Sequence, residues 1–151
     1  MKIAIAQINA TVADLAGNVE RIAGFAARAR AAGADLVVTP ELALCGYPPE
    51  DLLLREDFLA ACDEALANLA SRTTGITLVV GHPRTADGKR YNSASVIRGG
   101  QIIGMYDNQR LRNYTVFEEE PYFERGTRPY VFGHDGVSFG VNICEDTWGE
   151  E

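Results

Sequence analysis

Two side chains with reactive chemistry follow short apolar runs in this chain. Glu41 comes after Leu36-Val37-Val38-Thr39-Pro40, and Cys144 comes after Val141-Asn142-Ile143. In α/β sheets, reactive groups collect at the carboxyl ends of the strands. A thiol becomes a nucleophile when a neighbouring base removes its proton, and a carboxylate in an enclosed site is such a base. The pair therefore indicates thiol chemistry, although a lone buried cysteine is more often a small core residue.

Other chemistry has weaker support. Neither histidine is an obvious partner for the thiol, because His82 stands before Pro83 and His134 lies in a turn sequence. Nothing arranges Asp and Glu with histidine as metal ligands, so no metal site is expected. The glycines lack phosphate-cradling spacing, so this part of the protein is expected to bind neither ATP nor NAD. Cys45 and Cys62 are interpreted as packing residues.

The hydrophobic pattern predicts the elements that position these groups. Helical spacing indicates one helix over residues 18–30 and another carrying residues 58–69. Strands are expected at residues 3–8, 36–38, 76–80, 91–97, 102–106, 130–132 and 137–143, with Gly81-His82-Pro83 ending the third. The order β-α-β-α-β followed by hairpins predicts an α/β layered fold with a mixed sheet.

Composition narrows the class of protein. The 151 residues carry a formal net charge of -7 and allow one domain, expected over 1–151. This acidity argues against nucleic acid or an anionic membrane as the main partner, and the longest apolar runs are far too short to span a bilayer. Three widely spaced cysteines suit a reducing cytoplasm. Because the chain stops soon after a predicted strand, with no covering helix, we expect it to be a fragment that exposes an apolar face.

Several ordered motifs resemble the nitrilase (carbon–nitrogen hydrolase) superfamily. These are Thr39-Pro40-Glu41-Leu42, Gly46-Tyr47-Pro48, Tyr91-Asn92-Ser93-Ala94 and Asn142-Ile143-Cys144-Glu145-Asp146. More narrowly, the stretches 46–54 and 113–119 resemble the N-terminal glutaminase domain of glutamine-dependent NAD+ synthetases. The resemblance runs from residue 1 to 151. It implies the first portion of an α-β-β-α sandwich whose C-terminal part, and the synthetase domain that follows, are missing here.

The resemblance also implies a Glu-Lys-Cys catalytic set. Glu41 matches the general base and Cys144 the nucleophile that attacks the side-chain amide of glutamine, leaving a thioester that water hydrolyses. The backbone N–H of Glu145 matches an oxyanion donor. Glu119 matches a second glutamate beside the set, and Tyr114, Phe117 and the Glu145 side chain match the glutamine pocket. The implied partners are glutamine and the synthetase domain, which alone would hold ATP and Mg²⁺, and the complete protein is expected to be a homo-oligomer.

The lysine of this set does not match. Where the family reads Lys-Gln-x-Leu-Pro-Asn-Tyr, this chain has Asn108-Gln109-Arg110-Leu111-Arg112-Asn113-Tyr114, and Pro121 replaces a basic residue. The chain's two lysines, Lys2 and Lys89, lie in predicted elements remote from the site. Arg110, two residues further on, is an alternative cation. Its bulky, rigid guanidinium group makes it a poor substitute for the lysine. Losing an oxyanion donor costs on the order of 10²–10³ in rate, so the chain is expected to be inactive.

Three functions remain open at this stage. The first is the ammonia-supplying part of a glutamine-dependent synthetase. The second is a free-standing nitrilase-type amidase, which Pro48-Pro49-Glu50-Asp51-Leu52-Leu53-Leu54 disfavours. The third is a non-catalytic domain remnant, which Asn108 and the early end of the chain favour.

Overall fold

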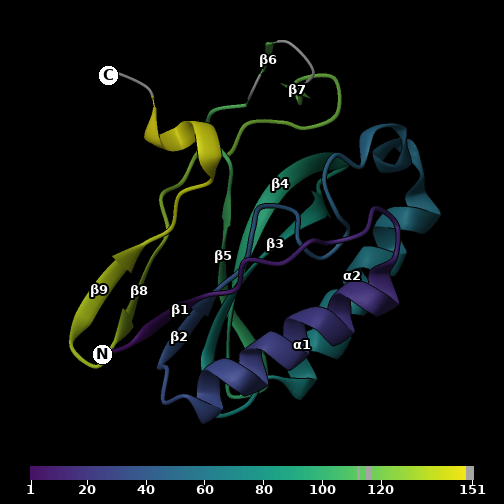
Figure 1. The fold of residues 1–151 in the computed structure, drawn as a ribbon. Helices are drawn as coiled ribbons and strands as arrows, with labels where there is room; N and C mark the ends of the chain where they lie inside the picture. The colour runs from purple at the N-terminus through teal and green to yellow at the C-terminus, as the bar shows by residue number, and fades with distance from the viewer. Residues whose placement is uncertain (112, 115–116, 149–151) are drawn as a thin grey trace.

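A five-stranded mixed sheet lies at the centre of the computed structural model, which describes residues 1–111, 113–114 and 117–148 (Figure 1). Its spatial order follows the chain: β1 (Ile3–Ile5), β2 (Leu36–Val38), β3 (Thr77–Ala86), β4 (Lys89–Arg98) and β5 (Gln101–Asp107). The first three strands are parallel, and the β3–β4 and β4–β5 pairs are antiparallel. β2, β3 and β5 therefore end at the same edge of the sheet.

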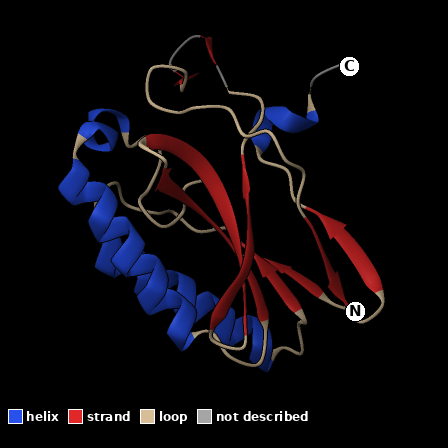
Figure 2. Ribbon diagram, turned by 180° about the vertical axis from the view of Figure 1, so that it is seen from behind, coloured by secondary structure: helices blue, strands red, loops and turns tan. Residues whose placement is uncertain are grey.

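Two helices cover one face of this sheet, α1 (Leu15–Ala31) and α2 (Glu56–Arg72) (Figures 1 and 2). Their apolar stripes pack on the sheet through a buried cluster that includes Ile22, Leu69 and Leu78. α1 begins before the predicted residue 18 because the Asp14 carboxylate accepts a hydrogen bond from Gly17 N at 3.0 Å and caps the helix. Within the part of the chain that the structure describes, no helix is both long and apolar enough to cross a membrane.

The opposite face of the sheet carries the hairpin of β8 (Val131–His134) and β9 (Val137–Gly140) (Figure 1). Phe132 and Ile143 pack there against Leu36 and Val96. A small pair, β6 (Asn113–Tyr114) and β7 (Phe117–Glu118), and the short 3₁₀ helices η1 (Glu50–Leu54) and η2 (Cys144–Thr147) complete the described elements. The mixed α/β fold is the one the sequence predicts.

Three predicted strand ends are wrong by three residues or more. β1 ends at Ile5 rather than at residue 8. β3 does not stop at Gly81-His82-Pro83 but continues to Ala86. Beyond Val79, β3 pairs only with β4, because its pairing with β2 ends there. Pro83, which has no backbone N–H, is therefore tolerated on the edge of β3 that faces away from β4. β9 ends at Gly140, and Val141–Ile143 continue outside the strand with their apolar side chains buried against the sheet.

The prediction that His82 lies at the end of the third strand is wrong as well. His82 is buried inside β3, with Nε2 at 2.7 Å from Ser95 Oγ and Nδ1 at 3.1 Å from the Pro83 carbonyl oxygen. The carbonyl can only accept, so Nδ1 carries the proton and Nε2 accepts from Ser95. Burial lowers the pKa of His82 to about 4, and the neutral ring is a structural member of the sheet.

We expect this histidine to make folding pH-dependent. The unfolded state binds a proton near the ordinary pKa of 6.5, whereas folded His82 does so only near 4. The free energy of unfolding should therefore decrease as the pH falls through this window, by about 3 kcal/mol in total. Urea denaturation of the parent, His82→Gln and the control His134→Gln tests this. His82→Gln should flatten the pH dependence between 6.5 and 4 while the control keeps it, and equal slopes in all three would contradict the assignment.

Candidate active site

Glu41 lies in the turn that follows β2, pressed against β3. The turn is held by a hydrogen bond of 3.0 Å from Leu44 N to the Gly81 carbonyl oxygen. A Cβ at Gly81 would lie 2.5 Å from Leu42 N, so only glycine lets the turn approach this closely. The close contact aims Glu41 across the end of the sheet rather than away from it.

The side chain of Asn92 joins Glu41 to Glu119. From β4, Asn92 Nδ2 donates to Glu41 Oε1 at 2.6 Å and to Glu119 Oε1 at 3.2 Å. Asn92 is fully buried and Glu119 is 4% exposed. The Glu41 and Glu119 carboxyl groups therefore meet at a buried amide, and the Glu119 carboxyl group is largely shielded from water. The structure therefore brings together the two glutamates named from the sequence. The sequence-based prediction assigns no role to Asn92. A polar amide within a run of otherwise buried strand residues could have indicated that it belongs to the site.

Asn108, at the predicted lysine position, stands beside Asn92. It directly follows β5 and continues the pairing with β4, since Asn108 N donates to the Asn92 carbonyl oxygen at 2.8 Å. Asn108 is completely buried. Its Nδ2 and the Oδ1 of Asn92 have no hydrogen-bond partner. Two hydrogen-bonded neighbours, Asn108 and Asn92, thus carry an unpaired buried donor and an unpaired buried acceptor. Leaving either atom unpaired lowers the free energy of unfolding.

Cys144 opens the short helix η2 and shares a pocket with Glu41. The pocket has a volume of about 110 Å³ and is lined by Val38, Thr39, Pro40, Glu41, Val79, Gly81, Ala94, Val141, Asn142, Ile143 and Cys144. Cys144 is half-buried and adopts a left-handed φ of +43°. Backbone strain of this kind in a non-glycine residue is characteristic of functional turns. Most of the lining is apolar, so the Glu41 carboxylate and the Cys144 thiol are the reactive groups of the pocket.

The remaining predicted positions are placed less completely. Glu145 follows Cys144 in η2 and is half-buried. Tyr114 and Phe117 lie in β6 and β7, but their side chains are outside the described residues, as is Arg112 altogether. Lys2 is distant from the site, because its Nζ donates to the Ala32 carbonyl oxygen at the far end of α1.

The other two cysteines form a separate, closed environment. Cys45 and Cys62 are 0% and 1% exposed and belong to one apolar cluster with Leu42, Leu53 and Phe123. A hydrogen bond with the Cys62 thiol, followed by burial, raises the pKa of Cys45 far above its ordinary value. These two residues are packing residues, as predicted, and Cys45 stays a neutral thiol.

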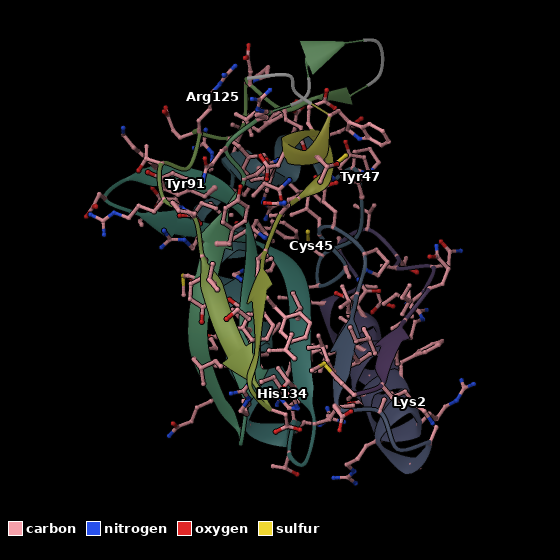
Figure 3. All side chains as sticks on the ribbon, turned by 90° about the vertical axis from the view of Figure 1, so that its left-hand side faces the viewer. Lys2, Cys45, Tyr47, Tyr91, Arg125 and His134 are labelled. Carbon is pink, nitrogen blue, oxygen red and sulfur yellow. The ribbon has the colours of Figure 1, made fainter. Side chains whose placement is uncertain are left out.

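Among the described residues, Asp35, His134 and Asp135 are close enough to share a cation. They lie at the other edge of the sheet from Glu41, because Asp35 precedes β2 whereas Glu41 follows it, and Figure 3 shows His134 well below Cys45 and Tyr47. His134 Nδ1 faces the donors Arg98 Nη2 at 3.2 Å and Thr77 Oγ1 at 3.3 Å, so this nitrogen accepts and Nε2 carries the proton. A metal bound at Nε2 would require the proton to be on Nδ1. The three residues therefore fit a hydrogen-bonded polar cluster rather than a metal site.

The profile of the carbon–nitrogen hydrolase family matches residues 2–151. The chain belongs to the carbon–nitrogen hydrolase family. A similar curated member is the glutamine-dependent NAD+ synthetase of Xylella fastidiosa, 49% identical over 155 residues; the match covers 100% of this chain but 28% of that protein. The chain thus spans little more than a quarter of the length of such relatives.

Solved structures of other members agree with the fold. The glutamine-dependent NAD+ synthetase of Acinetobacter baumannii superposes with a TM-score of 0.92 at 39% identity, covering 97% of this chain and 28% of that one. An amidase from Nesterenkonia sp. gives a TM-score of 0.83 at 29% identity, covering 97% of this chain and 56% of the amidase. A variant of that amidase carries acrylamide, joined by Michael addition, at its active-site cysteine.

We expect Cys144 to be the cysteine that reacts with a glutamine-like electrophile. Cys144 lines an open pocket beside a carboxylate, whereas Cys45 and Cys62 are closed off and Cys45 has a raised pKa. A chloroketone analogue of glutamine, followed by peptide mass spectrometry, should label Cys144 at least about tenfold faster than the other two. Denatured chain, in which all three thiols are accessible, is the control. Equal labelling of the three cysteines in the folded chain would mean that the site is not assembled.

Proposed function

We propose that residues 1–151 form the N-terminal portion of a glutaminase domain that supplies ammonia in a glutamine-dependent NAD+ synthetase. The observation that carries the proposal is the pocket shared by Glu41 and Cys144, with Asn92 linking Glu41 to Glu119. The synthetase relatives and the A. baumannii structure support the assignment more strongly than the amidase does, by identity and by superposition. The activity belongs to a protein longer than this chain.

The chemistry follows from the side chains at the pocket. Glu41 accepts the proton of the Cys144 thiol, and the thiolate attacks the side-chain amide carbon of glutamine. Backbone N–H groups of η2, that of Glu145 first, stabilise the oxyanion. The C–N bond breaks as the nitrogen takes a proton from Glu41, ammonia leaves, and water hydrolyses the γ-glutamyl thioester to glutamate. Acrylamide addition at the cysteine of the related amidase supports the thiol as the reactive group.

Asn108 lacks the positive charge that a lysine at this position would supply to the proposed reaction. A lysine ammonium at this position would donate to the carboxylates and offset their charge, whereas an amide offers a neutral donor. In the structure Asn108 Nδ2 is buried without a partner. This observation favours a second candidate function, a domain that keeps the family's architecture without its turnover. ATP and Mg²⁺ would be held outside these residues, and localisation in the cytoplasm and assembly into a homo-oligomer remain predictions.

We expect negligible glutaminase activity from the chain as it stands. Asn108→Lys should be necessary for recovery but insufficient, because residues following position 151 in the relatives complete the domain. Glutamate release from glutamine should be measured for the unmodified sequence and for Asn108→Lys, each as the chain of 151 residues and in a polypeptide extended through the whole domain. The extended variant should exceed its Asn108 counterpart by on the order of 10²–10³.

Cys144→Ala is the control for each of these polypeptides, and it should abolish any turnover. Substantial glutamate release by the unmodified chain, lost in Cys144→Ala, would show that the lysine is dispensable. Absence of activity in the extended Asn108→Lys polypeptide would contradict the glutaminase assignment and favour the non-catalytic one.

A further inference from the structure

One carboxylate outside the catalytic set accepts hydrogen bonds from two separate parts of the chain. Asp146 Oδ2 accepts from Ile143 N at 2.9 Å and from the Tyr106 hydroxyl at 2.7 Å. Asp146 Oδ1 accepts from Arg110 N at 2.9 Å and from Gln109 N at 3.1 Å. Hydrogen bonds to an ionised acceptor are roughly twice as strong as those between neutral groups. Asp146 is therefore a firm link between η2 and the segment that leaves β5.

The first half of this link fixes the turn that carries Cys144. Asp146 N donates to the Ile143 carbonyl oxygen at 3.0 Å while Ile143 N donates back to the Asp146 carboxylate. This reciprocal pair brackets Cys144, whose φ of +43° is an unfavourable backbone conformation for a non-glycine residue. Such a conformation persists only when its surroundings over-determine it, and Asp146 supplies the constraint.

The second half of the link reaches Asn108, which is hydrogen-bonded to Asn92. Arg110 N, which donates to Asp146, also donates to Asn108 Oδ1 at 3.2 Å. Asn108 N in turn donates to the Asn92 carbonyl oxygen at 2.8 Å, and the Asn92 amide holds Glu41 and Glu119. Hydrogen bonds and short stretches of backbone thus connect the nucleophile turn to the base without a break.

We propose that Asp146 is a positioning residue, which sets the Cys144 turn against the end of β5 and so places the thiol for attack on the amide held beside Glu41. The inference rests on the proposed function. Asp146 is absent from the lining of the pocket and acts through Ile143 N and the Gln109–Arg110 backbone. Its neighbour Tyr106 is held in the same network, and burial, followed by the Asp146 carboxylate, raises the pKa of that phenol.

The test compares two reagents on the folded chain of 151 residues. Both reagents are used above the ordinary thiol pKa of about 8.5, where Cys144 ionises without help from Glu41. There a chloroketone analogue of glutamine still needs correct placement of the thiol, whereas iodoacetamide needs only access to it. The variants are Asp146→Asn, whose amide must oppose one backbone N–H, and Asp146→Ala, which loses every contact. The matched control is Asp135→Asn, since the Asp135 side chain is 75% exposed in the β8–β9 turn. The buried Cys45 and Cys62 report unfolding within the same experiment.

Both Asp146 variants should lower the rate of Cys144 labelling by the chloroketone by about 10- to 100-fold, as expected for a displaced reacting group. Iodoacetamide labelling of Cys144 should change far less, Cys45 and Cys62 should stay unlabelled, and Asp135→Asn should behave as the parent. An unchanged chloroketone rate in Asp146→Ala would overturn the inference. So would a loss that affects both reagents equally and exposes Cys45 and Cys62, because that pattern reports a purely structural role.

Failure of the proposed function has a different signature. In that case the unmodified chain already shows no preference of the chloroketone for Cys144 over Cys45 and Cys62. A preference that is present in the parent and unaffected by the Asp146 variants rejects the positioning role alone.

Discussion

The Asn92 side-chain amide is the interaction on which this site depends. Its Nδ2 holds the carboxylates of Glu41 and Glu119, which come from the turn after β2 and from the segment after β7. A hydrogen bond to a charged group contributes about 1.5–3 kcal/mol, and losing a buried partner costs more. The mixed sheet makes the contact available, because antiparallel β4 starts where β2, β3 and β5 end.

Charge distinguishes this chain from the Glu-Lys-Cys set that its sequence resemblance implies. Asn92, which contacts both glutamates, and its neighbour Asn108 are neutral, so neither offsets the charge of Glu41 and Glu119. A cation about 4 Å from a carboxylate would contribute roughly 4 kcal/mol near a protein surface. Asn108 pairs through its backbone with Asn92 and Gly126, so the local architecture does not depend on a cation at position 108.

Local patterns predict the fold better than the site. The helices follow from apolar spacing, and Leu36–Val38 follows from a short buried run. The continuation of β3 through Pro83 was missed because it depends on β2 being short, which is a tertiary property. Glu41 and Cys144 follow from their positions after short apolar runs, and Glu119 follows from the family resemblance. Asn92 and Asp146 were not given roles, because an amide or a carboxylate acquires its function only from the partners that folding brings to it.

In the proposed function, Glu41 acts as the base for the Cys144 thiol. The most direct measurement is the pH dependence of Cys144 alkylation by iodoacetamide in the unmodified chain and in Glu41→Gln. The account predicts that Glu41→Gln reacts more slowly at neutral pH, by about tenfold or more, and that the difference shrinks as the thiol ionises unaided above its ordinary pKa of about 8.5. Equal rates at every pH, or faster alkylation of Glu41→Gln at neutral pH, would contradict it.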